Sequence, residues 1–298
     1  MGFDEWVLEH GPSEPVFYLW RNSPSVIIGL NQNPYAEVDL RYLQEHGIAL
    51  VRRITGGGAV YHDLGNLNYS IVGPSRCFDN DKPVQVVEAL RAMGVPAELT
   101  GRNDIFVDGR KCSGYAKRLS RDRMMIHGTL MFDVDIEVLV KALAAPGSKV
   151  SAAGIESVRS RVANLCDYLP GISMEQFTAA LQEHLAGGDI VISSEGKAEV
   201  EKSKFRSWEW IYGRSPEAEF RRSVRLSCGT VELAWSLRHG CLSGVHFGGD
   251  FIGLKDPAAL AARLEGVPFT PEAITPLLQD ASEFFDSTTP DELLAAFS

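Results

Sequence analysis

Three consecutive glycines, Gly56, Gly57 and Gly58, follow the adjacent arginines Arg52 and Arg53. Glycine weakens strands, so a run of three between two apolar segments indicates a loop that reaches positive φ and lets a ligand approach the backbone. Exposed N–H groups in such a loop form an anion nest, and arginine adds charge-assisted hydrogen bonds to phosphate or carboxylate. The segment therefore predicts an anion site, although a flexible hairpin tip would share this composition.

The glycine run by itself does not name its ligand. No Gly-Lys-Ser/Thr follows it, so it is not a P-loop, and no G-x-G-x-x-G pattern occurs there, so it is not a dinucleotide-binding fingerprint. Downstream, Asn66 and Asn68 could hydrogen-bond a nucleotide or could be turn residues. His62 and Asp63 resemble an acid–base pair, but we expect both to be structural.

Lys111 is the second candidate group. The preceding Asp108-Gly109, between apolar runs, predicts a type I′ hairpin turn, because both central residues need positive φ. This turn pairs position 107 with 110, 106 with 111 and 104 with 113, so alternation places Asp104, Lys111 and Ser113 on one face. A fixed ammonium there would offset the charge that develops when a carboxylate attacks phosphorus, whereas a solvated edge lysine is the alternative.

The neighbours of Lys111 have separate expected roles. Asp104 could pair with Lys111 or ligate magnesium. Alternation places Cys112 on the opposite face, with Ile105 and Val107, so we expect a buried structural cysteine rather than a nucleophile. The chain has five cysteines, scattered and never spaced C-x-x-C, which fits reduced thiols in a cytosol better than a disulfide framework or zinc site.

The elements that must position these groups follow from local patterns. Strands are expected over 16–20, 25–29, 48–53, 68–72 and 123–134, a hairpin over 105–112, and helices over 39–46, 82–93, 136–144 and 174–185. Beyond a linker at 213–216 we expect antiparallel strands over 222–237, a further strand pair over 242–252 and a helix over 257–264. Strands thus surround both the glycine run and Lys111.

Bulk properties narrow the class of protein. The 298 residues favour two domains, and 45% hydrophobic with 23% charged residues is typical of a globular chain. A net charge of -10 argues against a nucleic-acid binder. The first residues do not read as a signal peptide, and no run of about 18 apolar residues predicts a membrane helix.

Several motifs, in this order and spacing, resemble the lipoate-protein ligase family. They are Arg52-Arg53-Ile54-Thr55-Gly56-Gly57-Gly58-Ala59-Val60-Tyr61-His62-Asp63-Leu64-Gly65-Asn66, Gly101-Arg102-Asn103-Asp104-Ile105, Gly109-Arg110-Lys111-Cys112-Ser113-Gly114, His127-Gly128-Thr129-Leu130 and Glu156-Ser157-Val158-Arg159-Ser160-Arg161-Val162-Ala163-Asn164-Leu165. The resemblance covers essentially the whole chain. It implies an α+β fold: a catalytic domain over 1–210 with a mixed or antiparallel sheet of the biotin/lipoate ligase type, and a small α+β accessory domain over 217–298.

The resemblance also implies a two-step reaction. Lipoate attacks the α-phosphate of ATP, with Mg²⁺, to give lipoyl-AMP and pyrophosphate, and a lysine of an acceptor's lipoyl domain then takes the acyl group. The implied catalytic residue is Lys111. The implied ATP-binding residues are Arg52, Gly57, Gly58, Ala59, Val60, Asn66, Asp104 and Lys111. The implied lipoate-binding residues are Arg52, Gly57, Lys111, Ser113 and His127, with Asp104 as the metal ligand through the nucleotide.

The implied partners are lipoyl-domain proteins of 2-oxoacid dehydrogenase complexes and the glycine cleavage H protein, in the cytoplasm, with no nucleic acid or membrane. The accessory domain is expected to rotate when nucleotide binds. A basic stretch, Lys117, Arg118, Arg121 and Arg123, could steer an acidic acceptor or could be a solvated loop. The alternative function is an octanoyl or lipoyl carrier-to-carrier acyltransferase that uses a cysteine thioester, which requires an exposed Cys112.

Overall fold

The computed structural model describes residues 1–78, 83–100, 103–144, 150–186 and 203–297. Packing divides the chain into two compact units. The first comprises Met1–Leu30 and Glu37–Arg206, and the second comprises Asn31–Ala36 and Ser207–Ser298. The sequence boundaries 1–210 and 217–298 stay a prediction. Lys82, Gly101 and Arg102, which belong to expected elements or motifs, lie outside the described residues.

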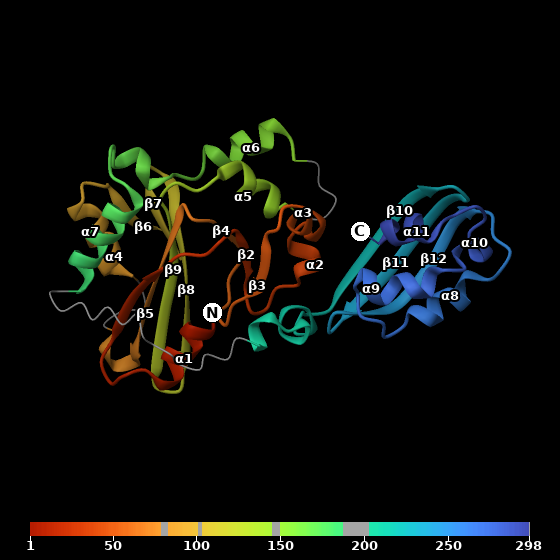
Figure 1. Cartoon of the computed structure of the whole chain (residues 1–298), viewed down its shortest axis with the longest axis horizontal. Helices are drawn as coiled ribbons and strands as arrows, with labels where there is room; N and C mark the ends of the chain where they lie inside the picture. The colour runs from red at the N-terminus through yellow and green to blue at the C-terminus, as the bar shows by residue number, and fades with distance from the viewer. Residues whose placement is uncertain (79–82, 101–102, 145–149, 187–202, 298) are drawn as a thin grey trace. The chain divides into compact units, whose positions relative to one another are not determined.

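A six-stranded antiparallel sheet forms the centre of the first unit, with the order β1-β5-β9-β8-β7-β6 (Figure 1). Its strands are β1 (Val16–Trp20), β5 (Asn66–Pro74), β6 (Ala97–Thr100), β7 (Asp104–Val107), β8 (Arg110–Ser120) and β9 (Arg123–Met131). Helix α1 (Gly2–His10) contacts β5 and β9. The sheet therefore joins the hairpin that carries Lys111 to strands far away in sequence.

The two faces of this sheet differ, because successive residues of a strand point to opposite faces. One face is apolar: Ile126 and Leu130 of β9 pack in a buried core with Leu90 of α4 (Val84–Ala92) and Phe177 of α7 (Met174–Ala186). On the other face, each polar residue of β5 pairs with a residue of β9: Asn66 with Met131, Asn68 with Thr129, and Ser70 with His127. The chemistry predicted from the sequence belongs to this polar face.

A smaller sheet of order β3-β2-β4 holds the glycine run. Strand β2 (Ser25–Ile28) is parallel to β3 (Ala49–Arg52) and antiparallel to β4 (Val60–His62), and the glycines lie between β3 and β4. Val26, Ile28 and Tyr61 form a core with Met131 of β9, which attaches the small sheet to the polar face of the large one. The expectation of mixed and antiparallel sheets is confirmed.

Three further helices complete the first unit: α3 (Leu40–Glu45), α5 (Ile136–Ala142) and α6 (Ala152–Arg159). Asp39 caps α3, as predicted, because its side chain accepts a hydrogen bond from the Tyr42 backbone N–H at 3.0 Å. Among the described helices, none is long and apolar enough to cross a membrane.

The second unit has a three-stranded antiparallel sheet of β10 (Ala218–Leu226), β11 (Gly229–Arg238) and β12 (Cys241–Phe251). Its helices are α8 (Pro257–Leu264), α9 (Pro271–Ile274), α10 (Ala281–Phe284) and α11 (Pro290–Ala296). The expected strand pair over 242–252 is wrong, because β12 is one continuous strand. Gly249 has φ +109° but pairs with Val231 instead of turning, and a Cβ there would lie 2.4 Å from the Thr230 carbonyl oxygen.

A short piece of the N-terminal half packs within the second unit. Helix α2 (Pro34–Glu37) begins in it, and Tyr35 is buried against Tyr212 and Phe269, with ring centroids 5.3 Å and 4.8 Å away. The Tyr35 hydroxyl donates to the Phe269 carbonyl at 2.7 Å, and the Asn33 amide donates to the Pro216 carbonyl at 3.1 Å. Residues Asn31–Ala36 are therefore part of the small unit, although they follow β2 in sequence.

Candidate active site

The β7–β8 hairpin positions Lys111. Asp108 has φ 49° and Gly109 has φ 72°, which confirms two positive φ values in the predicted turn, and Phe106 pairs with Lys111 as expected. The Lys111 Nζ atom lies 2.7 Å from Asp104 Oδ1, with both side chains partly exposed. The structure therefore brings together the cation and the carboxylate that the sequence placed on one face.

A β-bulge changes the pairing beyond this point. The register shifts between Phe106 and Ile105, so that Ile105 pairs with Ser113 and Asp104 pairs with Gly114. The predicted pairing of 104 with 113 is wrong, because the extra residue on β8 reverses the alternation. Ser113 shares the face of Ile105, a core residue, and is fully buried, so it does not lie on the face of Lys111 as expected.

Gly114, and not Ser113 as predicted, lies opposite Asp104 on the face of Lys111. A Cβ atom on Gly114 would lie 3.2 Å from Lys111 Nζ, 3.3 Å from Lys111 Cε and 3.7 Å from Asp104 Oδ1. The first two distances are shorter than ordinary van der Waals contact. Gly114 therefore leaves room for the Lys111–Asp104 pair, a role that sequence reasoning missed although the residue stands in the motif.

The backbone of Lys111 is held by a remote segment. Its N–H donates to the Arg161 carbonyl and its carbonyl accepts from the Ala163 N–H, both at 2.9 Å. Lys111 and Val162 thus form an isolated parallel bridge. This pairing gives a physical reason why the lysine motif occurs together with Arg161, Val162 and Ala163, which follow just after α6.

The two arginines before the glycine run are both buried. Arg52 is 0% exposed, and its Nη1 donates to the carbonyls of Gly29 and Leu30 at 3.2 Å and 2.9 Å. Arg53 is 6% exposed and reaches into the loop, where its guanidinium donates to the carbonyls of Gly56 and Gly58. The direct contact between Arg52 and ATP stays a prediction, and the loop itself is organised by Arg53.

The loop presents its glycines to solvent. Gly57 and Gly58 are exposed, and Ala59 and Val60 are half-buried. Gly57 has φ +93°, in the region where glycine is favoured, as expected for a close-approach loop. The predicted anion nest therefore has accessible backbone at the positions named from the sequence.

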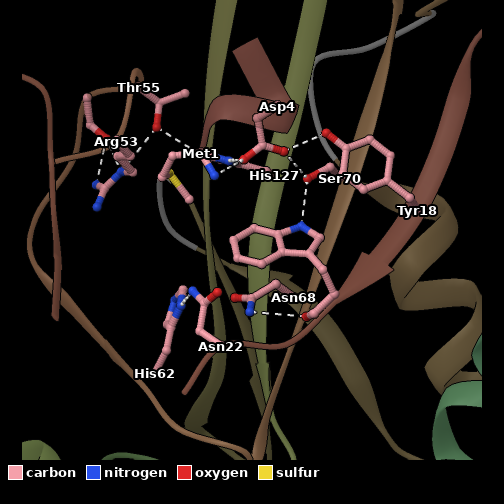
Figure 2. A network of polar contacts seen from close by, with 12 residues as sticks. Met1, Asp4, Tyr18, Asn22, Arg53, Thr55, His62, Asn68, Ser70 and His127 are labelled. Carbon is pink, nitrogen blue, oxygen red and sulfur yellow. Dashed lines mark hydrogen bonds and ion pairs between the residues drawn. The ribbon is translucent and has the colours of Figure 1, made fainter. Parts of the chain in front are cut away.

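His127 connects the loop to the large sheet (Figure 2). Its Nε2 lies 2.7 Å from the Thr55 hydroxyl oxygen, and its Nδ1 lies 3.8 Å from Asp4 Oδ2. Asp4 in turn accepts from the hydroxyls of Tyr18 and Ser70 at 2.5 Å and 2.9 Å. His127 is 5% exposed, and the contact that the structure shows for its Nε2 is the one with Thr55. The contact of His127 with lipoate stays a prediction.

The polar residues of β4 and β5 are buried. The Asn66 amide donates to Asn68 Oδ1 at 2.9 Å, and both residues are 1% exposed, so the nucleotide contact of Asn66 stays a prediction. Burial and the Arg53 charge lower the pKa of His62 to about 3, so this ring is neutral at pH 7. Asp63 accepts from the N–H groups of Gly65 and Asp135. The structural roles expected of His62 and Asp63 agree with these contacts.

Cys112 lies where the sequence predicted. It is 0% exposed, belongs to the core that contains Ile105 and Val107, and points its thiol at the Ile105 carbonyl. Burial raises its pKa to about 12, which suppresses the nucleophilic thiolate. The residue that a thioester mechanism would need is therefore inaccessible.

Asp104 suits magnesium only as a ligand shared with a nucleotide. Magnesium sites in nucleotide enzymes use one or two carboxylates together with substrate phosphates. In the described part of the chain, no cluster of three or more His, Cys, Asp or Glu side chains could hold a metal. The Asp104 carboxylate would supply one hard oxygen, and it would then have to share or leave Lys111.

The basic stretch on β8 and β9 is partly committed to internal contacts. Arg123 donates to the carbonyls of Val7, Leu8 and Pro12 near the end of α1. The Arg118 Nη1 donates to the Ile54 carbonyl, next to the glycine loop. Both of these arginines fix the fold, and the acceptor dock at this stretch stays a prediction.

Two protein families match this chain, one in its N-terminal part and one in its C-terminal part. Residues 1–186 match the family described as lipoyl protein ligase A/B catalytic domain, and residues 215–297 match the family described as bacterial lipoate protein ligase C-terminus. Lipoate-protein ligase LplJ of Bacillus subtilis is 36% identical over 312 residues, covering 99% of this chain and 94% of the relative. Lipoate-protein ligase 1 of Staphylococcus aureus is also 36% identical, covering 100% and 95%.

Solved structures agree with these sequence matches. The bipartite lipoate protein ligase of Thermoplasma acidophilum has a TM-score of 0.61 at 30% identity, over 70% of this chain and 89% of that one. A lipoate-protein ligase A bound with ATP has a TM-score of 0.53 at 32% identity, over 62% and 78%. The fold and the site thus define a protein of the lipoyl ligase type. The chain belongs to the lipoate-protein ligase family.

Proposed function

We propose that the chain uses ATP to activate lipoate as lipoyl-AMP and transfers the lipoyl group to a lysine of a lipoyl-domain protein. One arrangement carries this proposal: the Lys111 ammonium and the attachment of the glycine loop share one face of the large sheet. His127, which holds Thr55, pairs with Ala116 of β8. Gly114 lies two residues before Ala116 and so points to the same face, beside Lys111 Nζ.

The first step joins two anions, so it needs positive charge and outward N–H groups. A carboxylate oxygen of lipoate attacks the α-phosphorus of ATP, and the bond to pyrophosphate breaks. The glycine loop offers backbone donors, and Lys111 offers an ammonium that can move from Asp104 to the carboxylate and the phosphate. Magnesium held by the nucleotide and Asp104 would neutralise the departing pyrophosphate when it is bound.

In the second step, the neutral ε-amine of the acceptor lysine attacks the acyl carbon. The bond between this carbon and the AMP phosphate oxygen breaks, AMP leaves, and the nitrogen loses a proton. Acceptors with lipoyl domains are proposed because one similar structure is described as a ligase with its E2 lipoyl domain. Acceptors in 2-oxoacid dehydrogenase complexes and the glycine cleavage H protein, and a cytoplasmic location, extend this proposal.

The carrier-to-carrier transferase is not favoured. It requires an exposed, activated cysteine near Lys111, and Cys112 is fully buried with a raised pKa. Both functions can be tested together by mixing the protein with lipoate, ATP, Mg²⁺ and a lipoyl-domain protein. We expect pyrophosphate release and a mass increase of the acceptor, both dependent on ATP. Acyl transfer from an acylated carrier without ATP would instead support the transferase.

A further inference from the structure

The chain passes from one unit to the other more often than connectivity requires. It leaves the first unit after Leu30, returns to it at Glu37 and leaves it again after Arg206. The last crossing alone would join the two units. The six residues Asn31–Ala36, which we call the clip, therefore form an additional connection, and six extended residues span at most about 20 Å.

The clip is held at both ends by the first unit. Before it, the Leu30 N–H donates a hydrogen bond to the Thr55 carbonyl at 2.8 Å. After it, Val38 is 0% exposed and packs in one core with Val26 and Ile28 of β2. Both anchors lie within two residues of the clip, so a displacement of the clip is transmitted to β2 and its core, because no flexible linker intervenes.

Within the second unit, Tyr35 anchors the clip. Its ring is 7% exposed and lies 5.3 Å from the ring of Tyr212 and 4.8 Å, edge to face, from the ring of Phe269. Its hydroxyl donates to the Phe269 carbonyl. Asn33 is 4% exposed; its amide nitrogen donates to the Pro216 carbonyl and its amide oxygen accepts from the Tyr35 N–H, both at 3.1 Å. The clip thus packs in the second unit as one of its own core segments.

The second unit itself fixes the residues that receive Tyr35. The Trp208 ring stacks on the Tyr212 ring with centroids 6.2 Å apart, and we call Trp208, Tyr212 and Phe269 the aromatic cluster. Gly240, in the β11–β12 turn, has φ +75°, and its carbonyl accepts from the Phe269 N–H at 2.9 Å. A Cβ on Gly240 would lie 2.9 Å from Trp208 Cζ2 and 3.1 Å from the Tyr212 carbonyl carbon. This turn therefore supports both ring partners of Tyr35.

We propose that the clip couples the two units, so that the packing of Tyr35 in the aromatic cluster and the stability of strand β2 depend on each other. Such a coupling free energy is reciprocal: each site must change the other by the same factor. Strand β2 is the central strand of the small sheet, between β3 and β4, so the coupling reaches the sheet that holds the glycine run. The coupling itself needs no ligand and does not rest on the proposed function.

Hydrogen–deuterium exchange of the full-length protein without ligand tests the coupling, since backbone exchange measures local opening. Gly240→Ala alters only the second unit, where the new Cβ meets Trp208 and Tyr212. In Gly240→Ala and in Tyr35→Ala we expect the amides of residues 25–30 to exchange about fivefold faster or more, the lower end of typical coupling. Tyr35→Phe keeps the ring and loses one donor, so it should accelerate this exchange about twofold.

The matched control is Gly249→Ala. Gly249 is also a glycine of the second unit with positive φ, and a Cβ there would lie 2.4 Å from the Thr230 carbonyl oxygen, but its nearest atoms belong to β11 and not to the aromatic cluster. We expect Gly249→Ala to accelerate exchange in β11 and β12 and to leave residues 25–30 unchanged. Equal acceleration at 25–30 in Gly249→Ala would overturn the proposal, as would unchanged exchange there in Gly240→Ala and Tyr35→Phe.

The reverse direction uses the substrates and so rests on the proposed function. Adding ATP, lipoate and Mg²⁺ to the wild type should change the exchange of residues 207–216, and Tyr35→Ala should lose this response while still binding ATP by calorimetry. If the wild type binds ATP without any response at 207–216, or if Tyr35→Ala responds like the wild type, the coupling is refuted and the ligase function stands. If the wild type binds no ATP, the proposed function fails, and the ligand-free exchange still decides the coupling.

Discussion

Adding one methyl group at Gly114 should reduce catalysis without harming the fold. The new Cβ would lie 3.2 Å from Lys111 Nζ and 3.3 Å from Cε, so the ammonium must move by a few tenths of an ångström or more. A misplacement of about 1 Å can cost roughly 10²-fold in rate, so we expect Gly114→Ala to lower the rate of pyrophosphate release about tenfold. Gly114 has no positive φ, so alanine should not strain the backbone, and a less flexible unfolded chain should add about 0.4–1 kcal/mol of stability.

The assay compares Gly114→Ala with a strand glycine in the other unit. At Gly248 of β12 the nearest atom to a new Cβ would be His246 Cε1 at 3.5 Å, an ordinary contact. Initial rates of pyrophosphate release with lipoate, ATP and Mg²⁺, together with urea unfolding, separate catalysis from stability. A Gly114→Ala enzyme with the same rate as Gly248→Ala would show that the space beside Lys111 does not matter for the chemistry. A large loss of stability in Gly114→Ala would equally contradict the reasoning.

Three further predictions concern other parts of the structure. Cys112→Ser should retain ATP-driven lipoylation, since the thiol is buried in the core, and loss of all activity in a folded variant would revive the transferase. His62 has its pKa lowered from 6.5 to about 3, so between these pH values the unfolded chain binds a proton that the folded chain does not. Urea unfolding should show stability falling as pH drops below about 6.5, by several kcal/mol at most, with a flatter profile in His62→Gln. Tyr35→Phe should destabilise the second unit by about 1 kcal/mol, because the Phe269 carbonyl loses its 2.7 Å donor, and an unchanged unfolding midpoint would contradict this.

Local chemistry made parts of the site predictable. Asp108-Gly109 specifies a turn by its own backbone preferences, and this turn alone places Phe106 opposite Lys111. Likewise, a polar residue at every second position of β5, as in Asn66, Asn68 and Ser70, marks one face of a sheet whose other face is core. These signals need no knowledge of distant residues.

The missed features depend on contacts between distant segments. The β-bulge places Gly114, and not Ser113, opposite Asp104. It lies next to the pairing of Lys111 with Arg161–Ala163, a segment about fifty residues further along the chain, so no local pattern predicts it. The alternation of residues between the two faces of a strand also cannot tell which of two adjacent arginines contacts the glycine loop when both are buried, as Arg52 and Arg53 are. Their different roles become apparent only when the partners on β2 and the glycine loop are known.

The most direct test of the Lys111 site is pyrophosphate release from ATP and Mg²⁺ with lipoate, octanoate or biotin, in the wild type and in Lys111→Ala. We expect release with lipoate, little with biotin, and a loss of at least about 10²-fold in folded Lys111→Ala, as for removal of a charge-stabilising donor. Near-normal release by Lys111→Ala would contradict the role assigned to the lysine, and no release by the wild type with lipoate would contradict the ligase function.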